Sequence, residues 1–320
     1  MTNLMKYGNL VLLVFALVFA SCKNDDDGDG VETVPPKLLS DIAPEDDAKI
    51  KEFLSTHFYN YEDFDPATQP ADFDFKIRID TLAGDNAQKR PLSEDAVPVT
   101  LKVSSSFLGL SAGEEDVPHS LYYIEARAGG GGSPTYADSI FVSYKGTLLD
   151  GTVFDENKDF IWFEIASISR GARGFSDGVA QLSAGTPGQV IEHGDGTFSF
   201  GDSGIGMFIL PSGLAYFNNP PGSIPSYSPL IFHVELGTYV EDTYTDNDGV
   251  PNIREDVNGN GYLFDDDTDG DLQANFLDVD DDGDGVTTRK EITDDNGEII
   301  FPYPDSNGDG IPDYLDPNVN

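Results

Sequence analysis

The chain has 320 residues and a formal net charge of −40, with 58 acidic side chains against 18 basic ones. Nucleic acid is not expected as a partner, because its phosphates would be repelled, and direct adsorption to anionic lipid headgroups is disfavoured. The aromatic content of 11% nevertheless indicates that much of the chain is ordered around a core. The length allows two or three domains.

Residues 1–21 have the layout of a secretory signal peptide. One lysine, Lys6, precedes an apolar run from Leu10 to Ala20, and a small residue follows. The run is about half of the roughly 20 residues that a membrane-spanning helix needs. We therefore expect this segment to direct export rather than to span the bilayer.

The single cysteine, Cys22, directly follows this segment and cannot form a disulfide within one chain. Phe19-Ala20-Ser21-Cys22 resembles the lipobox of bacterial lipoproteins, in which the cysteine is acylated. The resemblance implies a cell-envelope lipoprotein of a Gram-negative bacterium, anchored in the outer membrane through lipid on Cys22. The acidic residues 22–40 are then either a solvated tether or a signal for export to the outer face of that membrane.

Residues 41–118 are predicted to form an N-terminal extension. Ile50, Phe53 and Leu54 recur at helical spacing behind a run of acidic residues, which predicts an amphipathic helix. The segments 73–80 (FDFKIRID) and 97–104 (VPVTLKVS) alternate like strands. This extension is expected either to pack on the next domain or to form a small separate unit.

Residues 119–240 are predicted to form an α+β domain. The segments 139–146 (SIFVSYKG) and 230–240 (LIFHVELGTYV) predict strands, and an Asp-Gly turn is expected within LLDGTVFDE. Residues 174–185 (GFSDGVAQLSAG) predict one short amphipathic helix. The segment 189–206 is expected to extend a hairpin. Several strands wrapped around one helix would give this domain its own core.

Four blocks of this domain carry a family resemblance: VSYKGTLLDGTVFDE, RGFSDGVAQLSAG, LPSGLAYF and GSIPSYSPLIFHVEL. In order and spacing they resemble the FKBP-type peptidyl-prolyl isomerases. The resemblance implies a curved antiparallel sheet around a short helix, with a shallow apolar pocket between them. It also implies an enzyme that acts on proline-containing polypeptides without a cofactor for catalysis.

The resemblance places the pocket of such an isomerase at eight residues: Tyr144, Phe154, Asp155, Phe163, Phe175, Tyr216, Ile224 and Phe232. One departure is Gly171-Ala172, which replaces larger apolar residues at the pocket rim. Rotation of a peptide bond costs about 18–20 kcal/mol because amide resonance is lost. A dry aromatic pocket favours the less polar, twisted transition state, so no acid or base is needed.

The last segment, residues 241–320, holds 24 acidic and three basic residues. Asp280, Asp282, Asp284 and Glu291 meet the spacing of a calcium-binding loop, with Gly285 at the sharp turn. Two further copies of this spacing supply the other predicted calcium ligands: Asp256, Asn258, Asn260 and Asp267, and then Asp305, Asn307, Asp309 and Asp316. A copy ending at Glu255 has Tyr244 at the first ligand position and is interpreted as degraded.

The turn glycines of these copies lie too close together for a helix on each side of every loop, so paired EF-hands are not expected. The segment instead resembles thrombospondin type 3-like repeats. That resemblance implies several structural Ca²⁺ ions along a loop-rich spacer with little hydrophobic core.

The resulting hypothesis is a lipid-anchored peptidyl-prolyl isomerase that assists the folding of exported or cell-surface proteins. The alternative is a non-catalytic module that binds prolyl peptides or mediates calcium-dependent surface contacts. The small rim residues favour the alternative, whereas Tyr144, Asp155 and Tyr216 favour the enzyme.

Overall fold

The computed structural model describes residues 35–194, 196 and 198–319. The predicted signal peptide, Cys22 and most of the acidic tether therefore lie outside the described residues. In the described part of the chain, no helix is both long and apolar enough to cross a membrane.

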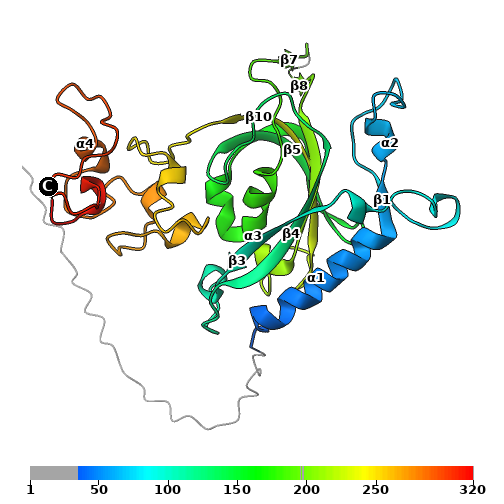
Figure 1. Cartoon of the computed structure of the whole chain (residues 1–320), viewed down its shortest axis with the longest axis horizontal. Helices are drawn as coiled ribbons and strands as arrows, with labels where there is room; N and C mark the ends of the chain where they lie inside the picture. Colours follow the sequence, from blue (N-terminus) through cyan, green and yellow to red (C-terminus); the bar gives the residue numbers. More distant parts are fainter. Residues whose placement is uncertain (1–34, 195, 197, 320) are drawn as a thin grey trace, which may run out of the picture. The chain divides into compact units, whose positions relative to one another are not determined.

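A six-stranded antiparallel sheet curves around one helix, α3 (Ile165–Val179), as Figure 1 shows. This agrees with the predicted α+β class. The strand order is β3 (Val97–Val103), β4 (Val117–Arg127), β9 (Gly204–Leu210), β10 (Leu230–Val240), β5 (Ser139–Leu148) and β6 (Val153–Glu164).

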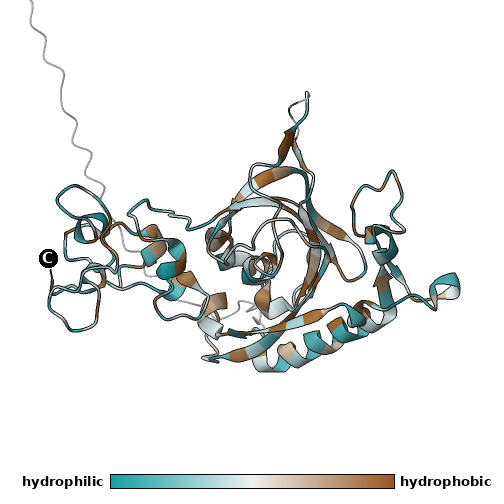
Figure 2. Ribbon diagram, turned by 45° about the horizontal axis from the view of Figure 1, so that its top comes forward, coloured by the Kyte–Doolittle hydropathy of each residue, from teal (hydrophilic) through white to brown (hydrophobic). Residues whose placement is uncertain are grey.

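Strand β9 is buried along its whole length because both faces of the sheet are covered. Phe208 and Leu210 point into the core around α3, whereas Met207 and Ile209 point into a second core under α1 (Leu39–Thr56). The core around α3 is called the inner core, and it contains Phe175 and Phe232 of the predicted pocket. The core under α1 is called the outer core. Figure 2 shows hydrophilic residues over much of α1 and hydrophobic residues on the strands around α3.

The N-terminal extension packs on the isomerase-like domain, the first of the two arrangements expected from the sequence. Ile50, Phe53 and Leu54 of α1 lie in the outer core, which confirms the amphipathic helix. Strand β3 pairs with β4 and so joins the main sheet. Only the end of the predicted strand 73–80 forms, in β2 (Ile79–Thr81), which pairs with β1 (His57–Tyr59).

That shortened strand has a local cause. Phe75 has a φ of 56°, a left-handed conformation that cannot continue a strand. Short helical turns fill much of the remaining extension: α2 (Tyr61–Phe64), η1 (Gly84–Asn86), η2 (Leu92–Glu94) and η3 (Ser105–Leu108).

The predicted helix of the isomerase-like domain starts earlier than expected and ends sooner. It begins at Ile165, which is fully buried, and it is kinked at Ala172, whose φ and ψ are −129° and 72°. The Asp-Gly turn between β5 and β6 is present, with Gly151 at a φ of 84°. The predicted hairpin is also present, in β7 (Val190–Glu192) paired with β8 (Phe198–Phe200).

The C-terminal segment consists mainly of loops with short helical turns. These are η5 (Asn252–Arg254), η6 (Leu263–Asp265), η7 (Asn275–Leu277), α4 (Thr288–Glu291) and η8 (Asp313–Leu315). Leu263 and Phe276 pack with Ala137 and Ala166 of the isomerase-like domain. The first part of the segment is thus fastened to that domain by a shared apolar cluster.

Candidate functional site

The seven aromatic and apolar residues predicted for the pocket meet in one cluster between α3 and the sheet. Phe175, Ile224 and Phe232 are buried in it, and four others pack against them with half-buried side chains: Tyr144, Phe154, Phe163 and Tyr216. The Phe175 and Phe232 ring centroids are 5.1 Å apart, and Phe154 lies 5.6 Å from Phe232, both edge to face. The result is an aromatic wall of the kind that a proline ring can pack against.

Strand register explains how residues distant in sequence reach this wall. Phe232 of β10 lies opposite Gly146 of β5, and Gly146 lies opposite Asp155 of β6. A Cβ on Gly146 would come within 2.5 Å of the Phe154 ring. Glycine at this position therefore makes room for Phe154 between the two strands.

Tyr144 and Asp155 form the polar part of the pocket. The Tyr144 hydroxyl donates a 2.6 Å hydrogen bond to Oδ2 of Asp155. Burial, followed by this hydrogen bond and the Asp155 charge, raises the pKa of Tyr144 above its ordinary value. Burial and the same carboxylate also raise the pKa of Tyr216. Both hydroxyls therefore stay protonated at neutral pH, and a protonated hydroxyl can donate a hydrogen bond.

The rim of the pocket is open where the sequence departs from the family. Gly171 lies directly before the kink in α3, and a Cβ added to it would meet only the Tyr216 ring, at 3.6 Å. No side chain of α3 stands beside Tyr216 at this position.

The predicted calcium loop at 280–291 brings its carboxylates together. Oxygens of Asp280, Asp282 and Asp284 lie within 4.8 Å of one another. The Gly285 backbone N–H donates to Asp280, and the φ of 93° at Gly285 provides the sharp turn. Both carboxylate oxygens of Glu291 are buried without a hydrogen-bond partner among the described residues, and burial raises its pKa to about 8.

The loop at 305–316 has a similar local pattern. Gly310 N–H donates to Asp305 at 3.0 Å, and the Asn307 amide donates to Asp316 at 2.7 Å. Its predicted ligands are therefore gathered around one turn.

The loop that begins at Asp256 has a different arrangement around its last predicted ligand, Asp267, which the sequence also assigns to the neighbouring Asp269 set. Asp256 accepts a hydrogen bond from Gly261 N–H, as the repeated pattern requires. Asp267, however, groups with Asp269 and Asp271 of the neighbouring loop. The side-chain amide of Asn260 instead donates to Asp265.

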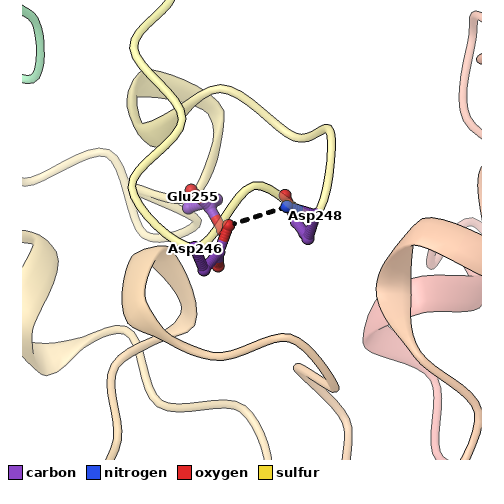
Figure 3. Close-up of side chains that lie close together, drawn as sticks. All are labelled: Asp246, Asp248 and Glu255. Atoms are coloured by element: carbon purple, nitrogen blue, oxygen red, sulfur yellow. Dashed lines mark hydrogen bonds between the residues drawn. The ribbon is translucent and has the colours of Figure 1, made fainter.

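The most deeply buried acidic cluster is the one that the sequence marked as degraded. Figure 3 shows Asp246, Asp248 and Glu255 facing one another, with their oxygens within 4.8 Å. Glu255 is 1% exposed, and neither of its carboxylate oxygens has a hydrogen-bond partner among the described residues. Burial, followed by the charges of Asp246, Asp248 and Asp281, raises the pKa of Glu255 to about 10.

Asp281 is a further buried acid whose charge acts on Glu255, and sequence spacing did not point to it. It is 2% exposed, and its Oδ1 atom also has no partner in the described part of the chain. It belongs to the 280–291 loop, and its charge contributes to the raised pKa of Glu255. Spacing within one loop carries no signal for such a residue. An all-oxygen, strongly anionic set of this kind fits a hard cation such as Ca²⁺.

Comparison with known proteins agrees with the pocket. A family model described as FKBP-type peptidyl-prolyl cis-trans isomerase matches residues 130–237, and one described as BamM C-terminal matches residues 245–304. Peptidyl-prolyl cis-trans isomerase Fkbp12 of Drosophila melanogaster is 36% identical over 105 residues, which cover 32% of this chain and 82% of that protein. The chain belongs to the FKBP-type peptidyl-prolyl cis-trans isomerase family.

Other relatives match over a smaller share of their length. FkpA of Aeromonas hydrophila is 30% identical over 151 residues, 46% of this chain and 49% of that protein. The outer membrane protein MIP of Legionella longbeachae is 30% identical over 30% of this chain and 40% of that protein. The crystal structure of FkpA from Escherichia coli has 28% identity and a TM-score of 0.29, covering 37% of this chain and 47% of that one.

The chain thus spans about half the length of the FkpA relatives it matches. The resemblance of the Asp-rich segment to thrombospondin type 3-like repeats stays a prediction, since the family model on that segment is a different one.

Proposed function

We propose that this protein is a peptidyl-prolyl cis-trans isomerase that assists the folding of exported or cell-surface polypeptides at the outer membrane. The observation that carries the proposal is the convergence of Tyr144, Phe175, Tyr216 and Phe232 on one pocket, with Asp155 fixing the Tyr144 hydroxyl. Similarity to relatives named as isomerases supports the same activity.

The pocket performs this reaction by binding and desolvation alone. A proline ring enters against Phe175 and Phe232, and the peptide bond before it lies among aromatic rings rather than in water. The twisted amide separates less charge than the planar one, so loss of water destabilises it less. Tyr216 has no hydrogen bond to another described side chain, and its protonated hydroxyl donates to the substrate carbonyl. Asp155 orients Tyr144 and moves no proton.

The C-terminal segment is proposed to bind several structural Ca²⁺ ions. Buried carboxylates without partners, as at Glu255 and Glu291, support this assignment because burial of an uncompensated charge is costly. The ligands proposed for Ca²⁺ are the acids and amides of the loops at 256–267, 280–291 and 305–316, together with the Glu255 cluster. Lipid on Cys22 is proposed as the anchor, and proline-containing polypeptides as the partners.

The isomerase proposal is tested by following cis-to-trans conversion of a short X-Pro peptide with the full chain. Tyr216→Ala and Phe232→Ala are expected to lower kcat/KM by at least about a hundredfold, because each removes a wall or donor of the pocket. Phe141→Ala is the matched control, since Phe141 packs on Phe160 and Trp162 outside this pocket.

A folded chain that leaves the conversion rate at its uncatalysed value would overturn the enzymatic proposal. The alternative, a prolyl-peptide binder without turnover, would then be supported by peptide binding that Phe232→Ala abolishes. This alternative is supported by Gly171, which leaves the rim of the pocket without a side chain.

A further inference from the structure

A second cleft adjoins the isomerase pocket, and its walls come from three segments far apart in the sequence. It has a volume of about 590 Å³. Phe107 of η3 comes from the N-terminal extension, Gly171 and Tyr216 come from the isomerase domain, and Tyr262 and Phe264 come from the Asp-rich segment. Volumes of this order are typical of ligand-binding clefts in proteins.

The cleft borders the predicted isomerase pocket at Tyr216. Tyr216 belongs to both, and Gly171 lies beside the Tyr216 ring without a side chain of its own. A polypeptide whose proline occupies the pocket would reach the cleft past Tyr216 and Gly171. Gly171, a small residue that the sequence places at the pocket rim, thus lines the cleft, whereas Ala172 is buried in the core.

The walls of the cleft are held in place before any ligand arrives. The Phe107 and Tyr262 rings are 4.3 Å apart, and the Tyr262 hydroxyl donates to the Phe107 carbonyl oxygen at 3.3 Å. Arg173, which is 7% exposed, donates from its guanidinium to the Asn260 carbonyl oxygen at 2.7 Å and the Lys102 carbonyl oxygen at 3.1 Å. A preformed cleft loses less conformational entropy on binding.

The chemistry of the lining matches an extended polypeptide with a large apolar side chain. Phe264 offers a half-buried ring, held by the Arg170 guanidinium at 5.1 Å and by Phe276 at 5.0 Å. Asn218 and Asn219 also line the cleft, and their side-chain amides bond to no other described residue. Such amides pair with backbone N–H and C=O groups, while the rings receive the side chain.

We propose that this cleft is a client-binding subsite, which selects polypeptides with an aromatic or large aliphatic residue within about three positions of the proline. An extended chain rises about 3.3 Å per residue, so three residues reach about 10 Å from the proline. The proposal rests on the isomerase function for its client, and it assigns part of the client specificity to the Asp-rich segment.

Photocrosslinking tests the subsite on the unmodified full chain. The probes are twelve-residue peptides with one X-Pro bond and a benzoylphenylalanine one, two or three positions from the proline, on either side. Adducts mapped by mass spectrometry are expected on residues 106–109 or 262–265. Adducts confined to the isomerase pocket, or spread over unrelated surface, would overturn the proposal.

Peptide binding provides a second, independent test. Phe264→Ala is expected to raise the Kd of a peptide with phenylalanine near its proline by about tenfold, and to leave a serine counterpart unchanged. Phe301→Ala is the control, because Phe301 is 65% exposed and lies outside the cleft lining. An equal effect of Phe264→Ala on both peptides would contradict a subsite.

The two proposals fail in different ways. One outcome is that the full chain fails to accelerate X-Pro conversion while peptide binding still depends on Phe264. That result would support the client-binding subsite and contradict the enzymatic function. If conversion is accelerated but neither crosslinks nor binding involve the cleft, the isomerase stands and the subsite is wrong.

Discussion

Arg173 in helix α3 donates a hydrogen bond of 2.7 Å to the backbone carbonyl oxygen of Asn260 in the Asp-rich segment. Its Nε atom lies 3.5 Å from Oδ2 of Asp177, and the two side chains are 7% and 9% exposed. One buried guanidinium thus joins the helix that carries the pocket floor to the C-terminal loops. The Asp-rich segment is for this reason part of the surroundings of the pocket rather than a free spacer.

Loss of this guanidinium is expected to be costly. Arg173→Ala should lower the free energy of unfolding by about 3 kcal/mol, because it leaves Asp177 buried without its partner and frees two carbonyl oxygens. Urea denaturation followed by circular dichroism measures the change. Lys290→Ala, at an exposed position of the same charge, is the control and should change stability by less than about 0.5 kcal/mol. Equal stabilities of the two variants would contradict the role assigned to Arg173.

Stability should also depend on pH through Asp177. Burial raises the pKa of this carboxyl to about 6, against the partly offsetting effect of Arg173. The folded protein therefore holds this proton more tightly than the unfolded chain, so the contribution of Asp177 to stability falls as pH rises from about 4 to about 6. At about 1.4 kcal/mol per pKa unit, the change is on the order of 3 kcal/mol.

The matched measurement is the difference in unfolding free energy between the natural chain and Asp177→Asn at several pH values. The variant keeps the size of the side chain but cannot ionise, so the difference should change across this window. A constant difference from pH 4 to pH 7 would show that Asp177 has an ordinary pKa.

A second buried acid connects the N-terminal helix to the pocket. Asp46 of α1 is fully buried, and its Oδ2 accepts hydrogen bonds from the backbone N–H of Ser212 at 2.8 Å and from the Ser212 hydroxyl at 2.5 Å. Ser212 begins the turn that leads to Tyr216. Asp46→Ala should cost about 3 kcal/mol, because the Ser212 N–H would stay buried without an acceptor.

Asp46→Ala should also displace Tyr216. Isomerase activity should therefore fall by more than the loss of folded protein accounts for. Glu45→Ala, one residue away on the exposed side of α1, is the control for both measurements. If Asp46→Ala and Glu45→Ala unfold at the same urea concentration, α1 is not anchored through this carboxylate.

Removal of calcium should loosen the Asp-rich segment and spare the sheet. The acids of residues 241–320 repel one another when no cation lies between them, so EDTA is expected to speed amide hydrogen exchange there and leave β5, β9 and β10 protected. Glu255→Gln should weaken Ca²⁺ binding at the calcium site proposed for this cluster by about tenfold or more, since it removes a buried carboxylate charge. Calorimetric titration with Ca²⁺ measures this affinity.

Asp295→Asn is the matched control for the calcium measurements, because Asp295 is an exposed acid of the same segment outside the clustered groups. Exchange rates that EDTA leaves unchanged throughout residues 241–319 would remove the calcium assignment. A Glu255→Gln chain with the affinity of the natural chain would limit calcium to the other loops.

Much of this protein was predictable from the sequence because the relevant signals are local. Alternation of apolar residues placed β10 at Leu230–Val240, and the four family blocks contained every predicted pocket residue except Phe163. The spacing of aspartates around glycines likewise predicted the turns at Gly285 and Gly310, since the first acid accepts the glycine N–H. These features depend on residues a few positions apart in the chain.

Only the tertiary structure decided the relationships between distant segments. Spacing marked the copy ending at Glu255 as degraded, yet its three acids form a buried cluster, and the charge of Asp281 from another loop acts on Glu255. The cleft beside Tyr216 exists because Phe107, Tyr262 and Phe264 converge from both ends of the chain. Side-chain periodicity reports which face of an element is buried, but not which element covers it, and that choice depends on packing of the folded chain.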